Sequence, residues 1–100
     1  MIIVVGTVTG RADSIDALIA AGTEHVGRSR AEDGCISHAM SIDAEDPLTL
    51  VFVETWRDMA ALSAHFAVPA TQRFGETLAQ LGGGARMTIY EAAAIRTIGG

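Results

Sequence analysis

Apolar and polar residues along this chain follow two different periods, which together predict four strands and three helices. Alternating or β-branched apolar runs predict strands over residues 2–9, 35–43, 48–56 and 87–95. Apolar residues at helical spacing from Ile15 to Ser29 predict a helix that is capped at Asp13 or Ser14 and stopped by the segment 32–34 (Glu-Asp-Gly). Two further helices are expected over 58–66 and 69–81, and the three glycines 82–84 are expected to end the second of them.

Counting the two adjacent helices as one connection, the element order is β-α-β-β-α-β. This order is typical of the ferredoxin-like α+β arrangement, a four-stranded antiparallel sheet with helices packed on one face. The short turn 44–47 between two strands predicts an antiparallel hairpin. There is no repeat or linker, so residues 1–100 are expected to form a single domain.

The predicted strands carry apolar residues on both faces. In the first strand, Ile3 and Val5 point one way while Ile2 and Val4 point the other, and the third strand shows the same pattern. Helices on one side of a sheet leave its other side uncovered. A second copy of the sheet is the simplest cover, so we expect a homodimer whose sheets meet face to face.

Composition and charge narrow the possible partners and location. The net charge is −5 and all seven basic residues are arginine, which argues against a nucleic-acid backbone or an anionic membrane surface as partner. No apolar window reaches the roughly 18 residues of a membrane span, and the apolar N-terminus lacks the basic region of a signal sequence. The single cysteine, Cys35, excludes an internal disulfide and indicates a reducing, cytoplasmic location.

Three candidate functional residues lie where the strand 48–56 is followed by a helix. Glu54 and Trp56 are at the end of the strand, and His65 is in the helix. Alternation puts Phe52, Glu54 and Trp56 on one face of the strand, so a carboxylate shares a row with apolar side chains. Such burial is costly unless the carboxylate has a partner. His65 is a candidate general base that Glu54 would orient, because an imidazole titrates near neutral pH.

Each of these residues also has a structural interpretation. Trp56 could be a core residue, His65 could bond to a backbone carbonyl, and Glu54 could pair with Arg57 or Arg73. Under the functional interpretation, Trp56 and Phe52 bound a pocket for a planar substrate, and Arg73 holds an anionic oxygen.

The other histidines and Glu32 receive weaker assignments. His38 is expected on the same strand face as Ile36, lining either the pocket or the dimer face, with a structural role as its alternative. His25 is expected on the solvent side of the first helix, and Glu32 in a turn. No two His or Cys residues show the local spacing of metal ligands, so no metal and no cofactor are expected.

Several of these residues carry a resemblance to a known family. The segment 32–37 (Glu-Asp-Gly-Cys-Ile-Ser), the pair at 46–47 (Asp-Pro), and the segment 54–58 (Glu-Thr-Trp-Arg-Asp) with Ala61 and His65 resemble the antibiotic biosynthesis monooxygenase family. The resemblance covers nearly the whole chain. It implies a dimeric α+β barrel built from ferredoxin-like subunits.

The family includes cofactor-free oxygenases of anthrone-type polyketides, quinol oxidases, haem-degrading enzymes and an enzyme of a phosphorylated signalling sugar. The resemblance therefore implies a cofactor-independent monooxygenase or oxidase of a small phenolic or quinol-type substrate. The matching oxygenases also use an asparagine and a tyrosine where this chain has Phe52 and Leu62. A non-catalytic small-molecule-binding dimer, or an isomerase or lyase of an oxygenated metabolite, remains the alternative.

Overall fold

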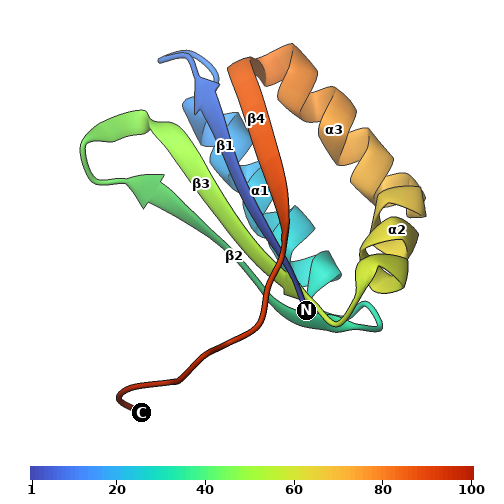
Figure 1. Ribbon diagram of the computed structural model, residues 1–100. Coiled ribbons are helices and arrows are strands. Elements are labelled where there is room, and N and C mark those ends of the chain that lie inside the picture. The colour runs from blue at the N-terminus through green and yellow to red at the C-terminus, as the bar shows by residue number, and fades with distance from the viewer.

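Two apolar strands form the centre of the sheet in the computed structural model, which describes residues 1–100. The strands β1 (Ile2–Gly10), β2 (Cys35–Asp43), β3 (Asp46–Trp56) and β4 (Gly82–Glu91) pair antiparallel in the order β2-β3-β1-β4. The helices are α1 (Ile15–Ser29), α2 (Met59–Ala67) and α3 (Pro69–Leu81). The expected ferredoxin-like α+β fold is confirmed (Figure 1).

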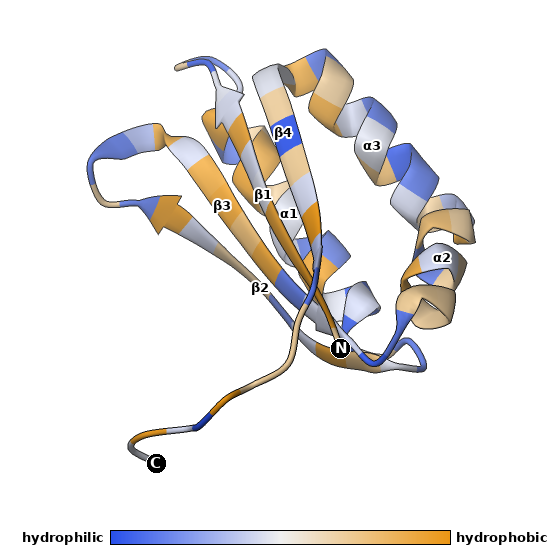
Figure 2. Cartoon of the chain, viewed as in Figure 1, coloured by the Kyte–Doolittle hydropathy of each residue, from blue (hydrophilic) through white to orange (hydrophobic).

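The helices cover one face of the sheet, and alternation decides which strand residues they bury. Helices α1 and α3 pack against each other, with α1 behind the sheet and α2 joining β3 to α3 (Figure 1). Val4 and Val8 of β1 are buried beneath them, and so are Leu50 and Trp56 of β3. The orange apolar stretches of β1 and β3 in Figure 2 mark this central part of the sheet.

The opposite face of the sheet is open. Val5 of β1, Val53 of β3 and Tyr90 of β4 are 38%, 45% and 52% exposed. Apolar side chains on both faces of the sheet are therefore confirmed. None of the three helices has both the length and the apolar character needed to cross a bilayer.

The last strand lies earlier in the chain than expected. It spans Gly82–Glu91 instead of 87–95, and the three glycines belong to the strand. Pairing with β1 sets this register, because Thr9 lies opposite Gly84 and Gly10 opposite Gly82. A side chain at Gly82 would place its Cβ 2.7 Å from the Leu78 carbonyl oxygen, so only glycine fits this close passage from helix to strand.

A bulge in β2 changes which side chains face the helices. Cys35 lies opposite Trp56 and Ser37 opposite Thr55, so Ile36 is an extra residue without a partner in the ladder. The expectation that Ile36 shares a face with His38 is therefore wrong: Ile36 is 60% exposed and His38 only 2%. The bulge lets Cys35 pack beside Trp56 while His38 still points inward.

Candidate functional site

A groove of about 620 Å³ lies between α3 and the half of the sheet formed by β1 and β4. Phe74 and Leu78 of α3 line one wall, Met87 of β4 lines the other, and Phe52 of β3 lies between them. Gly6 of β1 also faces the groove, and its missing side chain leaves room there. This volume lies within the range of small-molecule sites, and its lining is mostly apolar.

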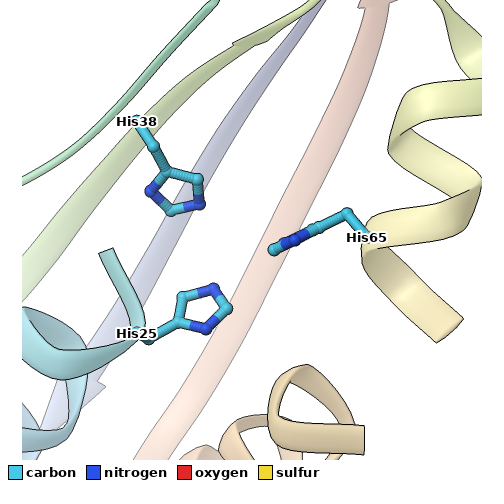
Figure 3. A group of neighbouring side chains, drawn as sticks. All are labelled: His25, His38 and His65. Carbon is cyan, nitrogen blue, oxygen red and sulfur yellow. The ribbon is translucent and has the colours of Figure 1, made fainter. Parts of the chain in front are cut away.

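All three histidines of the chain meet at one end of this groove. His25 comes from α1, His38 from β2 and His65 from α2, and Figure 3 shows their rings pointing into a common space. One ring nitrogen of each lies within 4.8 Å of the other two. Their exposed fractions are 4%, 2% and 2%, so the cluster is buried beside the groove.

The expectation that His25 faces solvent is wrong. The buried positions of α1 include Leu18, Gly22, His25 and Ser29, spaced by four, three and four residues. That spacing puts His25 on the inner face of the helix. Its ring stacks on Phe74 with centroids 4.1 Å apart, and burial lowers the pKa of His25 to about 4, helped by the nearby His38 and His65.

His65 is held by Glu32 rather than by Glu54. Its Nδ1 lies 2.9 Å from Oε1 of Glu32, in the turn between α1 and β2. Since a carboxylate accepts hydrogen bonds, this contact places the proton on Nδ1 and leaves the lone pair on Nε2. Nε2 lies 4.0 Å from Oε1 of Glu54. His65 and Glu54 both line the groove, but the role of orienting His65 belongs to Glu32.

Glu54 is buried but has partners that keep it charged. Trp56 Nε1 donates a hydrogen bond of 2.9 Å to Oε1 of Glu54, and Nε2 of His38 lies 3.3 Å from the same oxygen. Burial by itself would raise the pKa of Glu54. The contacts with His38 and Trp56 outweigh it, so the pKa lies below its usual value. The groove therefore ends at a buried negative charge.

The remaining expected site residues divide into two groups. Phe52 lines the groove, whereas Trp56 is fully buried behind His65, with ring centroids 4.6 Å apart. Trp56 therefore supports the site and does not form its wall. His38 is likewise buried below the groove surface. Arg73 is exposed on α3 and is not among the groove-lining residues, so the structure does not bring it to the site.

The arrangement can position a planar apolar molecule and take a proton from it. Phe52, Phe66 and Phe74 supply aromatic surface, and His65 supplies a ring nitrogen at the polar end. The three imidazoles also form a set of nitrogen donors that could hold a metal ion.

Comparison with known proteins agrees with the fold. The family described as antibiotic biosynthesis monooxygenase matches residues 1–77. A protein of Synechocystis, the uncharacterized protein sll1783, is 33% identical over 98 residues, which are 97% of this chain and 67% of that protein.

Solved structures give the same result. A candidate antibiotic biosynthesis monooxygenase from Deinococcus radiodurans is 28% identical, with a TM-score of 0.94 over 100% of both chains. Rv0793 from Mycobacterium tuberculosis is 25% identical, with a TM-score of 0.88 over 96% of this chain and 98% of that one. The chain therefore belongs to the antibiotic biosynthesis monooxygenase family.

Proposed function

We propose that this protein is an oxygen-dependent enzyme that oxidises a small planar phenolic or quinol-type substrate without a redox cofactor. The observation that carries the proposal is the end of the apolar groove, where His65 is held by Glu32 at 2.9 Å and faces Glu54. Membership of the antibiotic biosynthesis monooxygenase family supports the same class of reaction.

The groove suits a flat ring. Phe52 and Phe74 contact each other edge to face, with centroids 6.0 Å apart, and offer an aromatic surface on which a substrate ring would stack. The gap left by Gly6 gives the ring room beside β1. A substrate in this position directs its hydroxyl group toward His65.

Proton removal is the step that the protein performs. Nε2 of His65 accepts the hydroxyl proton, and the resulting imidazolium lies between the carboxylates of Glu32 and Glu54. This pairing stabilises the charge that develops on His65. The substrate becomes a phenolate in an apolar groove, where an anion is a stronger electron donor than it is in water.

The electrons come from the substrate. The phenolate passes one electron to O₂, which gives a substrate radical and superoxide. These two radicals then react with each other, either by transfer of a second electron to superoxide or by forming a bond. For a quinol, one quinol and one O₂ give one quinone and one hydrogen peroxide. For a phenol with an activated methylene group, the radicals combine to a peroxide that loses water, so that CH₂ and O₂ give C=O and H₂O. Neither balance requires an external reductant.

Oxygen uptake with a panel of quinols tests the proposal. The variant His65→Ala should lower turnover at least about a hundredfold, the low end of the contribution of a general base. Gln80→Ala, an exposed substitution on α3 outside the groove, should keep full activity. Unchanged uptake in His65→Ala would overturn the assignment. Thermal stabilisation by quinols without any turnover would instead indicate a non-catalytic binding protein.

We also propose that two copies pair through the open faces of their sheets. The exposed side chains of Val5, Val53 and Tyr90 give that face an apolar surface that solvent would otherwise contact. Proteins of this family are typically dimeric, which supports the same assembly.

A further inference from the structure

The histidine cluster contains buried ring nitrogens that nothing in the chain satisfies. Nδ1 of His25 and both ring nitrogens of His38 are buried without a hydrogen-bond partner. Nε2 of His38 lies 3.3 Å from Glu54, close enough to stabilise the carboxylate charge but poorly aligned for a hydrogen bond. Unpaired buried polar atoms are costly, and three of them in a single cluster require a physical reason.

A metal ion would supply the missing partner. Imidazole nitrogens bind zinc and its neighbours, and three histidines with one open position are a recurring arrangement of catalytic zinc sites. The three nitrogens span at most 4.8 Å, compared with about 3.3 Å in a tetrahedral site with 2.0–2.1 Å bonds. Rotation of the side chains by roughly 1.5 Å at their tips would close that difference.

The surroundings of the cluster also have the form of a metal site. Glu32 accepts from Nδ1 of His65 and so directs Nε2 inward, the carboxylate–histidine relation that commonly supports a ligating imidazole. The charged Glu54, fixed by Trp56, lies 3.3 Å from His38 and 4.0 Å from His65. Its negative charge would partly neutralise a divalent ion.

We propose that His25, His38 and His65 together bind one divalent transition-metal ion of the zinc class, with a further coordination position open to the groove. The donor set excludes the magnesium and calcium class, whose ligands are oxygens. Cys35 is outside the three-histidine group, so the site is built from imidazole alone.

This inference goes beyond the proposed function and can fail separately from it. In the metal-free protein, His65 accepts the substrate proton. With a metal ion bound, Nε2 of His65 would be one of its ligands, and the ion would supply Lewis-acid chemistry at its open coordination position. Metal binding is measured without substrate, so loss of either proposal leaves the other standing.

The test is a titration of tag-free, chelator-treated protein with Zn²⁺, followed by NMR of the histidine ring protons. The chain has only three histidines, so the spectrum reports the whole site without any substitution. One equivalent of Zn²⁺ should shift all three sets of ring signals, and Co²⁺ should give the visible absorption of a four-coordinate ion. Shifts of one or two rings, or none at saturating Zn²⁺, would overturn the proposal.

Variants give a second readout. His25→Gln and His38→Gln should each lower Zn²⁺ affinity at least about tenfold by calorimetry, and Glu32→Gln should lower it about tenfold through His65. Cys35→Ser is the matched control, since it removes the only thiol of the chain, and should bind Zn²⁺ as the natural protein does. If either histidine variant bound Zn²⁺ as tightly as the natural protein, or if Cys35→Ser lost binding, the assignment would be contradicted.

Discussion

Nδ1 of His65 lies 2.9 Å from Oε1 of Glu32, although 33 positions of sequence separate the two residues. Glu54, the carboxylate that the sequence pattern suggested as the partner of His65, lies on the other side of the same ring. Its Oε1 is 4.0 Å from Nε2 of His65. His65 is thus placed between two carboxylates with different tasks. Glu32 fixes the ring and its tautomer, and Glu54 sets the charge at the end of the groove.

Removing the Glu32 side chain should lower turnover without weakening substrate binding in the groove. We expect Glu32→Ala to reduce kcat about 10- to 100-fold in quinol oxidation with little change in KM, because the ring loses its orientation but the apolar walls remain. Glu32→Gln, which can still accept a hydrogen bond, should recover part of the loss. Steady-state oxygen uptake measures both. An unchanged kcat in the alanine variant would show that Glu32 does not position His65.

A methyl group at Gly6 should narrow the groove without disturbing the fold. Its Cβ would lie 3.5 Å from the Arg86 carbonyl oxygen and 3.9 Å from Cβ of Phe52, which are ordinary contacts. We expect Gly6→Ala to raise KM for a planar quinol several-fold at unchanged melting temperature. The control is Gly27→Ala in the exposed interior of α1, where the new Cβ would meet nothing within 4 Å beyond the backbone of its own helix. It should raise the free energy of unfolding by about 0.5–1 kcal/mol and leave KM unchanged.

The indole of Trp56 should matter through its N–H as well as its bulk. Trp56→Phe removes the 2.9 Å hydrogen bond to Glu54 and leaves a buried carboxylate with one partner fewer. We expect the free energy of unfolding to fall by about 1–3 kcal/mol, and the pKa of Glu54 to rise. Urea denaturation and carboxyl NMR titration measure the two effects. Full stability together with an unmoved Glu54 pKa would contradict this role.

Acid should destabilise the metal-free protein through His25. Its pKa is about 4 in the folded state and near 6.5 when unfolded, so the unfolded chain binds more protons between these pH values. The contribution is complete above pH 6.5 and is lost as the pH falls toward 4, by at most about 3 kcal/mol. Chelator-treated His25→Gln should lose less stability than the natural protein between pH 7 and 4.5. Parallel losses in the two proteins would contradict the assignment.

The open sheet face should control assembly. Val53 is 45% exposed at the centre of that face, and an aspartate there would put charge into an apolar interface. We expect light scattering to show a dimer for the natural protein and a monomer for Val53→Asp at micromolar concentration. Thr77→Asp on α3 is the control and should remain dimeric. A natural protein that is monomeric at this concentration would disprove the sheet-to-sheet dimer.

The fold could be predicted from the sequence because each element has its own period. β-Branched alternation identified β1 and β3, and the Asp58 cap, which accepts a hydrogen bond from the Ala61 amide, identified the start of α2. The glycine-rich start of β4 was missed. Glycines are ordinarily read as helix ends, and only the pairing of Thr9 with Gly84 shows that they form a strand.

The site was predicted less completely. Strand alternation put Phe52 and Glu54 on one face, and His65 follows in the next helix. The helical spacing of Leu18, Gly22 and Ser29 could also have placed His25 on the buried face of α1. No local signal links Glu32 to His65, or gathers three histidines from two helices and a strand. We expected no metal because no two His or Cys residues show the local spacing of metal ligands. Such spacing cannot reveal metal ligands that come together only when the chain folds.

The most direct test of the account is a crystal structure of the metal-free protein with a non-oxidisable planar phenol. We expect the ring to stack against Phe52 and Phe74, with its hydroxyl oxygen within hydrogen-bonding distance of Nε2 of His65. A phenol bound elsewhere, or with its hydroxyl directed away from His65, would contradict the claim that this groove is the active site.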